Sequence, residues 1–316
     1  RALEQQLGVA LFLRTRRRVE LTPEGARLLE HARRVMDQLV TPQWLADQLG
    51  APDLRILDAT SFLPGTPRDP EAEYREAHIP GALFLDLSNL KDPDDPRPSM
   101  IPSNAQFATR MAQLGVSDTD RIVIYDNSPL ASSGRAWWLM RLFGAKQVAI
   151  LDSGLQRWIA EKRPIESGES AHTPGGHFAA GKDENQVRTK GDMLANIDSC
   201  AAQVLDARGA TRFTGEDPEP RPGMASGHIP GSLNLPTGKM LDADGNWKQG
   251  DAMRKTFTDA GVDLDRPLIM TCGSGVTACN LLFGAALTGK QDVAIYDGSW
   301  SEWGADPATP KATGAA

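Results

Sequence analysis

One cysteine of this 316-residue sequence is followed by residues that suit nucleophilic chemistry. An apolar run at 268–271 leads into Cys272, the sequence Gly-Ser-Gly comes next, and a helix is predicted to begin near Val276. The glycines let successive backbone N–H groups turn inward, and a ring of amides at a helix N-terminus stabilises an anion. A thiolate held in such a ring is a good nucleophile. The sequence therefore predicts that Cys272 is the reactive residue of an enzyme.

The remaining cysteines and two of the histidines are predicted to have structural roles. Cys279 lies on the following helix, Cys200 closes a helical run, and neither is followed by a loop of small residues. His78 and His228 occupy the same place in two similar segments, which favours a role in the fold. The three cysteines and five histidines show no spacing typical of a metal site, so we expect no metal. We also expect no organic cofactor.

The chain contains two similar halves, and the reactive loop belongs to the second. Four pairs of segments recur in the same order at an offset of about 145–150 residues: RILDAT and QVLDAR, AHIPGALFL and GHIPGSLNL, RIVIYD and PLIMTC, VAILDSGLQRW and VAIYDGSWSEW. This agreement indicates a tandem duplication without a third copy. Asp126 stands in the first half where Cys272 stands in the second, so only the second half has the nucleophile. Asp206 and Arg208 lie in a repeated segment and are expected to brace the loop.

Each half alternates short apolar runs, rich in valine and isoleucine, with helical stretches. This pattern predicts an α/β fold in which a parallel sheet is flanked by helices. Such sheets bind ligands at the carboxyl ends of their strands, which is where Cys272 is expected. The predicted boundaries are an N-terminal arm at 1–38, a first domain at 41–165, a linker at 166–186, a catalytic domain at 187–306 and a frayed tail at 307–316.

The duplication, the two HIPG segments and above all the CGSGVT sequence of the loop resemble the tandem-rhodanese sulfurtransferases over about residues 41–306. The resemblance implies two rhodanese domains, of which only the second is catalytic. It also implies that Cys272 takes sulfur from a donor, carries it as a persulfide and passes it to a thiol or to cyanide. Ser274 is then a second catalytic residue. The loop residues implied to bind the donor are Gly273, Gly275, Val276 and Thr277.

The residues after Cys272 indicate the donor within this family. Members that use thiosulfate carry Arg and Lys there, whereas Gly273 and Ser274 match the members that use 3-mercaptopyruvate and release pyruvate. Arg212 and Arg221, in TRFTGEDPEPR, match the two arginines with which the family holds the carboxylate and carbonyl of the donor. Arginine suits this role because it pairs with a carboxylate through two hydrogen bonds.

Two positions depart from the family pattern. In related enzymes a histidine and an aspartate of the first domain are proposed to relay protons with the loop serine. Counted from HIPG, these positions hold Ser99 and Ser88 in this chain. Neither serine titrates near neutral pH, so we expect slower proton transfer than in the relatives.

The arm at 1–38 differs from the rest of the chain in charge and in motif. Residues 1–40 carry eight arginines against five acidic residues, whereas the whole chain has a net charge of −7. The sequence LEQQLGVALFLRT, followed by RRVELTPEGARLLEHARRV, resembles the end of the recognition helix, the wing and the linker helix of LysR-type winged helix-turn-helix regulators. The helices that precede these elements in such regulators are absent from the sequence, so we expect no DNA binding by the arm.

Two alternatives to a 3-mercaptopyruvate sulfurtransferase stay open. One is a thiosulfate sulfurtransferase, and the other is a sulfur-sensing regulator whose arm binds DNA. Cysteine phosphatases also place a cysteine in a loop of amides, but they need an arginine six residues after it, and this chain has Ala278 there. Phosphatase activity is therefore not expected.

The expected setting is the cytoplasm. Three cysteines are too few for a disulfide framework, no run of about 18 apolar residues could cross a membrane, and the first residues do not resemble a secretory signal. The expected partners are a small-molecule sulfur donor and a thiol acceptor, such as thioredoxin or a low-molecular-weight thiol.

Overall fold

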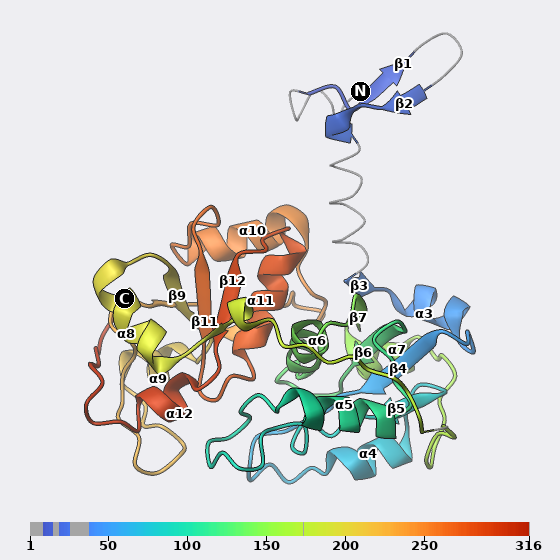
Figure 1. Ribbon diagram of the computed structural model, residues 1–316, viewed down its shortest axis with the longest axis horizontal. Helices are drawn as coiled ribbons and strands as arrows, with labels where there is room; N and C mark the ends of the chain where they lie inside the picture. Colours follow the sequence, from blue (N-terminus) through green and yellow to red (C-terminus); the bar gives the residue numbers. More distant parts are fainter. Residues whose placement is uncertain (1–8, 15–18, 26–37, 173, 316) are drawn as a thin grey trace.

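The computed structural model describes residues 9–14, 19–25, 38–172 and 174–315. Two α/β domains make up the body, and a small hairpin lies apart from them (Figure 1). The first domain contains β3 (Leu39–Val40), α3 (Pro42–Gln48), β4 (Leu54–Asp58), α4 (Pro70–Glu76), β5 (Ala82–Phe84), α5 (Asn104–Gln113), β6 (Arg121–Tyr125), α6 (Ser133–Leu142), β7 (Gln147–Leu151) and α7 (Gly154–Ala160). The second contains β8 (Val187–Arg188), α8 (Lys190–Ser199), β9 (Gln203–Asp206), α9 (Ala210–Thr214), β10 (Leu233–Asn234), α10 (Gly250–Asp259), β11 (Leu268–Thr271), α11 (Ala278–Leu287), β12 (Val293–Tyr296) and α12 (Ser299–Trp303). Short 3₁₀ helices lie at Glu184–Gln186 and Thr237–Met240.

The sheets of the two domains have the same strand order. Each sheet has five parallel strands, in the order β3-β7-β6-β4-β5 in the first domain and β8-β12-β11-β9-β10 in the second. Every strand therefore has a counterpart in the other domain, with β6 and β11 at the two centres. The predicted duplication and the predicted α/β fold are confirmed.

The central strands are buried because they are apolar on both faces, as expected where helices cover a parallel sheet on each side. All four residues of β11 are buried, and so are the last four of β6. Helix starts follow local capping rules. The Thr41 hydroxyl accepts a hydrogen bond from the Trp44 N–H (3.1 Å), and Pro42 takes the first helical position of α3.

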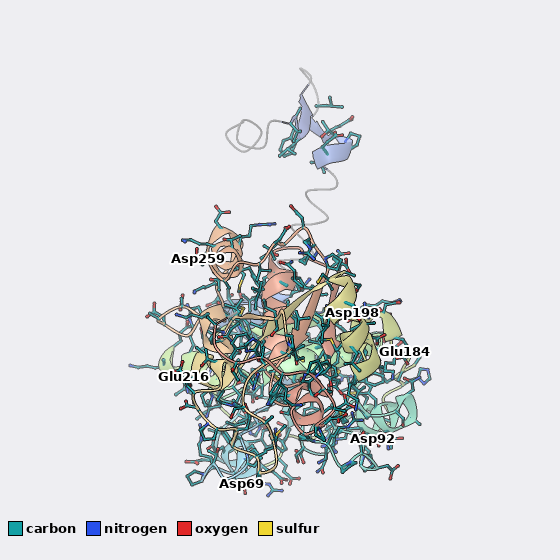
Figure 2. All side chains as sticks on the ribbon, turned by 90° about the vertical axis from the view of Figure 1, so that its left-hand side faces the viewer. Asp69, Asp92, Glu184, Asp198, Glu216 and Asp259 are labelled. Atoms are coloured by element: carbon teal, nitrogen blue, oxygen red, sulfur yellow. The ribbon has the colours of Figure 1, made fainter. Side chains whose placement is uncertain are left out.

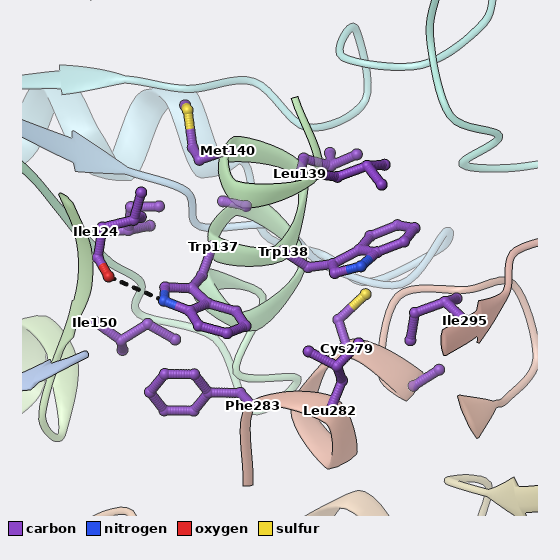
Figure 3. Close-up of a cluster of buried hydrophobic side chains, with 14 of the residues drawn as sticks. Ile124, Trp137, Trp138, Leu139, Met140, Ile150, Cys279, Leu282, Phe283 and Ile295 are labelled. Atoms are coloured by element: carbon purple, nitrogen blue, oxygen red, sulfur yellow. Dashed lines mark hydrogen bonds between the residues drawn. The ribbon is translucent and has the colours of Figure 1, made fainter. Parts of the chain in front are cut away.

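Helices α6 and α11 pack against each other and join the apolar cores of the two domains (Figure 3). The buried ring of Phe283 in α11 packs edge-on against Trp137 of α6, with 4.9 Å between the ring centroids. Trp247 packs against the same phenylalanine from another side, at 4.7 Å. This shared core places the loop before α6 close to the loop before α11.

Two segments differ from the predicted boundaries because each packs on a domain. After the first domain, Glu166 forms a β-bridge with His78, and Phe178 is buried in the core. After the second domain, Ala312 forms the corresponding β-bridge with His228. The predicted linker thus covers the first domain, and the segment predicted to fray belongs to the second. Both are poor in aliphatic residues, and backbone hydrogen bonds together with a few buried side chains, such as Phe178 and Thr309, hold them in place.

The first domain begins before the predicted position, because β3 pairs with β7 and the Gln38 carbonyl accepts a hydrogen bond from the Ile150 N–H (2.8 Å). Ahead of it, β1 (Phe12–Arg14) and β2 (Val19–Leu21) form an antiparallel hairpin, the element expected for a wing. The predicted helix before this hairpin lies outside the described residues, and of the predicted helix after it the structure describes residues 23–25, which are helical.

Acidic side chains are spread over the surface of the body, in keeping with the net charge of −7. Asp69, Glu216 and Asp259 are exposed and lie far apart in Figure 2. This charge disfavours general nucleic-acid binding by the two domains. Among the helices within the described ranges, none is long and apolar enough to cross a membrane.

Candidate active site

Cys272 lies at the carboxyl end of β11, the central strand of the second sheet. The residue is 1% exposed. The loop of residues 272–277 then leads into α11, whose N-cap is Thr277. The cysteine therefore lies between the end of a parallel strand and a helix N-terminus, where such sheets bind ligands and where backbone N–H groups favour an anion.

Hydrogen bonds from α12 hold the backbone of this loop. The Trp300 N–H donates to the Cys272 carbonyl and the Ser301 N–H donates to the Gly273 carbonyl, both at 2.9 Å. In a trans peptide the carbonyl and the N–H of one unit point in opposite directions. The two bonds therefore direct the N–H groups of Gly273 and Ser274 away from α12.

Five consecutive amides of the loop, those of residues 273–277, have no acceptor within the part of the chain that the structure describes. An N–H group in such a place needs a partner, which is then a water molecule or a ligand. Because these amides directly follow Cys272, they can hold an anion there, either the thiolate itself or a group bound to its sulfur.

The equivalent loop of the first domain holds an anion of its own chain. Asp126 stands at the position of Cys272, and its carboxylate accepts hydrogen bonds from the N–H groups of Ser128 (2.8 Å) and Ser133 (2.9 Å). Burial raises the pKa of Asp126, and these hydrogen bonds act in the opposite direction. In the first domain the loop holds a carboxylate of its own chain, whereas in the second domain the amides are left for another anion.

Asp206 and Arg208 form a buried ion pair behind the loop. Arg208 Nη2 lies 2.7 Å from Asp206 Oδ2 and also donates to the Gly227 carbonyl at 2.7 Å. The Arg208 guanidinium stacks on the ring of Trp300, 4.3 Å from its centroid. Because the Trp300 N–H holds the Cys272 carbonyl, the ion pair supports the loop through Trp300, which suits the bracing role expected from the sequence.

Arg212 reaches the loop, and Glu219 orients it. The Arg212 Nη2 atom lies 3.3 Å from the place that a Cβ on Gly273 would take. Arg212 pairs with Glu219, whose side chain is 3% exposed and whose other oxygen lies 2.7 Å from Arg208 Nη1. Arg221 is half-buried and has no hydrogen bond or ion pair with any described residue. Its guanidinium is therefore free to meet an anion.

The other predicted loop residues lie in place, but their side chains make few contacts of note. Ser274 and Thr277 are half-buried, and their hydroxyls have no hydrogen bond to any described residue. The Val276 carbonyl accepts a hydrogen bond from the Cys279 N–H (3.2 Å), which starts the turn into α11.

Ser88 and Ser99, which the sequence predicted at the positions of a proton relay, both lie in the first domain. Ser88 is exposed, and its hydroxyl donates to Asp86 (2.7 Å). Ser99 is half-buried, has a φ of 62° and accepts a hydrogen bond from Arg135 through its carbonyl. Neither side chain forms a hydrogen bond with Ser274 among the described residues.

Sequence reasoning missed four residues that contact the loop or its supports. They are Arg135, Glu219, Asp297 and Ser299. Glu219 lies in TRFTGEDPEPR, and Asp297 and Ser299 lie in VAIYDGSWSEW. Both segments were already recognised as motifs, so these three residues could have been found from the sequence. Arg135 comes from the first domain, and no pattern in the sequence connects it to the loop.

The other two cysteines are unlike Cys272. Cys279 is fully buried in α11, and its Sγ donates to the Gly275 carbonyl (3.2 Å). Burial raises the pKa of the Cys279 thiol to about 12, so it stays protonated at neutral pH. Cys200 is exposed at the C-cap of α8. Neither residue has the loop of amides that follows Cys272.

His78 and His228 have the same role in the two domains. His78 Nδ1 lies 2.8 Å from the Tyr74 carbonyl and its ring stacks on Tyr74, while His228 Nδ1 lies 2.9 Å from the Phe213 carbonyl and its ring stacks on Phe213. Both histidines are buried. The shared role in the fold is the one predicted from the repeat.

Gly275 is expected to tolerate no side chain. Its φ is 80°, and an added Cβ would lie 2.8 Å from Asp297 Oδ1 and 2.9 Å from the Asp297 carbonyl. Gly275→Ala should therefore displace the loop and slow the alkylation of Cys272 by iodoacetamide at least about tenfold. Mass spectrometry of the Cys272 peptide measures this rate.

Gly181→Ala is the matched control for that change. Nothing lies within 4 Å of a Cβ added at Gly181, so Cys272 should be alkylated at the rate of the unchanged protein. Equal rates in Gly275→Ala and Gly181→Ala would show that the loop does not depend on a glycine at position 275.

Comparison with known proteins assigns the class to which this fold and loop belong. The family model for the rhodanese-like domain matches residues 41–161 and 189–306. The chain belongs to the rhodanese-like family and carries two of its domains in tandem.

Named relatives include users of both expected donors. The 3-mercaptopyruvate sulfurtransferase of Mus musculus is 45% identical over 271 residues, covering 84% of this chain and 91% of that protein. The thiosulfate sulfurtransferase of Cricetulus griseus is 42% identical over 272 residues, with the same coverage of both chains. The crystal structure of SseA from Escherichia coli, described among the 3-mercaptopyruvate sulfotransferases, has a TM-score of 0.76 and 38% identity, covering 84% of this chain and 99% of that one.

A second family model, for the bacterial regulatory helix-turn-helix proteins of the lysR family, matches residues 1–26. This match agrees with the resemblance of the arm. It includes the hairpin of β1 and β2, while residues 1–8 and 15–18 of the matched region lie outside the described ranges.

Proposed function

We propose that this sulfurtransferase takes sulfur from 3-mercaptopyruvate and carries it as a persulfide on Cys272. The loop of residues 272–277 carries the proposal, because it places a cysteine before five amides that have no acceptor in the described chain. Arg212, which reaches the loop at Gly273, supplies positive charge for the carboxylate of the donor. The relatives named for this donor support the same conclusion.

The first half-reaction loads the sulfur. The Cys272 thiolate attacks the sulfur of the donor, an S–S bond forms, and the C–S bond of the donor breaks. The electron pair of that bond moves to the carbon, and pyruvate leaves as its enolate, which then takes a proton. Arg212 and Arg221 hold the carboxylate and carbonyl of the donor, and the loop amides with Ser274 stabilise the charge that develops.

The second half-reaction unloads the sulfur. An acceptor thiolate or cyanide attacks the outer sulfur of the persulfide, the new bond to that sulfur forms, and the S–S bond to Cys272 breaks. The Cys272 thiolate is the leaving group and returns to the ring of amides. No metal or organic cofactor takes part in this scheme.

The charge of the residues around Cys272 favours 3-mercaptopyruvate over thiosulfate as the donor. Gly273 and Ser274 add no positive charge after the cysteine, and Arg212 already shares the Glu219 carboxylate, so the site suits a donor with one carboxylate better than the dianion thiosulfate. Thiosulfate is the second candidate because relatives of that name are also similar. The kcat/KM for each donor, with cyanide as acceptor, tests the choice, and a higher value for thiosulfate would reverse it.

Restoring the proton relay of the relatives should make the enzyme faster. In Ser99→His with Ser88→Asp, the histidine would supply an acid–base group at a position where this chain has a serine, and such a group is typically worth about 10²–10⁴-fold in a step limited by proton transfer. Position 99 has a positive φ, a conformation that histidine tolerates better than most residues. We expect a higher kcat with mercaptopyruvate and a new inflection between about pH 6 and 7. Steady-state rates across that pH range measure both.

Ser99→Gln with Ser88→Asn is the control, since it adds polar side chains that do not titrate. A double variant with histidine and aspartate that is no faster than this control would show that Ser99 and Ser88 do not occupy the positions of a relay in this fold.

The acceptor is proposed to be a thiol, such as thioredoxin or a low-molecular-weight thiol, in the cytoplasm. The three cysteines are all free thiols, which suits a reducing compartment. The alternative of a sulfur-sensing regulator requires the arm of residues 1–38 to bind DNA. A gel-shift assay with the full chain and random duplex DNA tests this, and a shift at physiological salt would favour the sulfur-sensing regulator instead.

A further inference from the structure

The catalytic loop of the second domain is held by an arginine of the first domain. Arg135 extends from α6, and its Nη1 donates to the Gly275 carbonyl (3.1 Å) and to Asp297 Oδ1 (2.7 Å). The same atom lies 3.9 Å from the Sγ of Cys279, while Nη2 donates to the Ser99 carbonyl. One side chain thus joins two domains at the loop that bears Cys272.

This contact belongs to a set that relates the two domains by approximate two-fold symmetry. Asp297 accepts a hydrogen bond from the Ile101 N–H of the first domain (2.8 Å), and Asp152 accepts the corresponding bond from the Trp247 N–H of the second (2.9 Å). In the same way, each of the helices α6 and α11 holds the loop of the opposite domain. On the α11 side, Asn280 donates to the Leu130 carbonyl in the first-domain loop (2.7 Å).

The two domains differ in the residue that holds the loop of the opposite domain. The first-domain loop, which has no nucleophile, is held by the neutral amide of Asn280. The loop with Cys272 is held by a cation whose side chain is only 3% exposed. Burial, the largest single influence, lowers the pKa of Arg135, but the charge of Asp297 and the contacts with Asp297 and Cys279 together raise it further, so the net shift is upward and the side chain stays charged.

We propose that the first domain, although it has no nucleophile, supplies Arg135 as a positioning residue for the catalytic loop. Arg135 holds the Gly275 carbonyl, and the N–H of the same peptide unit, which belongs to Val276, points the opposite way. It does for this amide what α12 does for the amides of Gly273 and Ser274. Arg135 thereby completes the ring of amides, and it touches neither the donor nor the reacting sulfur. The inference rests on the proposed role of Cys272 as nucleophile.

Three variants test this role. Arg135→Lys keeps the charge beside Asp297 but loses the planar group that reaches Gly275, and Arg135→Met with Asp297→Asn removes the cation without leaving a carboxylate buried alone. Arg141→Met is the matched control, because Arg141 lies on the same helix and its guanidinium rests on the Trp137 ring, away from the loop. For each protein we would measure the melting temperature, the alkylation rate of Cys272 with iodoacetamide, and kcat and KM for mercaptopyruvate.

The double variant is expected to melt within a few degrees of the unchanged protein, with kcat about 10²-fold lower and KM nearly unchanged, because a displaced loop slows chemistry without removing a donor contact. Its Cys272 should be alkylated at least about tenfold more slowly. The kcat and the alkylation rate of Arg135→Lys should lie between those of the double variant and the unchanged protein. Arg141→Met should match the unchanged protein in both.

A normal kcat in a folded double variant would overturn the proposal, and so would a loss confined to KM, since Arg135 would then bind the donor. If the double variant does not fold, Arg135→Lys decides, and normal kcat with normal alkylation in that variant overturns the role. An equal loss in Arg141→Met would show a general effect of α6 and also overturn it. Alkylation needs no donor, so a failure of the unchanged protein to form a persulfide would count against the proposed function alone.

Discussion

Replacing Cys272 by serine is expected to lower sulfur transfer by more than about a thousandfold. Serine has nearly the same shape, so the buried site and the hydrogen bond from Trp300 to the backbone of residue 272 should remain. Its hydroxyl is not ionised by amides at neutral pH, and it cannot form a persulfide. The measurement is pyruvate release from mercaptopyruvate with cyanide as acceptor, alongside the melting temperature.

Cys279→Ser and Cys200→Ser are the matched controls, because they make the same change elsewhere in the domain. Serine at 279 can still donate to the Gly275 carbonyl, and Cys200 is exposed at a helix end. Both variants should retain most of the activity. Activity of more than a few per cent in Cys272→Ser, or a comparable loss in either control, would contradict the assignment of the nucleophile.

Replacing Arg212 or Arg221 by alanine is expected to lower kcat/KM for mercaptopyruvate about 10–150-fold each, which corresponds to roughly 1.5–3 kcal/mol of lost transition-state stabilisation. Each change removes a charge-assisted pair with the carboxylate or the carbonyl of the donor. Arg212→Ala should have the larger effect, because it also leaves the buried Glu219 with one partner fewer. Steady-state kinetics on both variants, with melting temperatures, measures the effect.

Arg266→Ala is the control for these two variants. Arg266 lies in the same domain and donates to the Cys200 carbonyl, so its loss removes an arginine without touching the loop. It should leave kcat/KM nearly unchanged. Unchanged kcat/KM in both Arg212→Ala and Arg221→Ala would rule out the two arginines as the carboxylate clamp.

The sequence predicted the fold well because the fold is repeated. A strand such as β11 is recognisable as an apolar run in any chain, but its counterpart β6 at nearly the same offset shows that both belong to a duplicated sheet. The same comparison placed Cys272 opposite Asp126 and so indicated which half carries the proposed nucleophile. The loop was recognisable because two glycines flank Ser274 between a predicted strand and a predicted helix, and such glycines let backbone N–H groups turn toward a bound anion.

What the sequence did not show depends on contacts between distant residues. Arg135 pairs with Asp297 across the domain interface, and the sequence around either residue does not predict this contact. The segments around Phe178 and Ala312, residues 166–186 and 307–316, contain no valine, leucine or isoleucine, so hydrophobic periodicity does not reveal the residues that pack them on the domains. Glu219 pairs with both Arg208 and Arg212, and only folding brings the three side chains together.

The most direct test of the central claim is mass spectrometry of the Cys272 peptide after one turnover without acceptor. With mercaptopyruvate, the peptide should gain the mass of one sulfur atom, one pyruvate should be released for each modified protein, and the peptides of Cys200 and Cys279 should be unchanged. Addition of cyanide should remove the extra mass and give thiocyanate. Pyruvate release without added mass on Cys272, or added mass on another cysteine, would contradict the account.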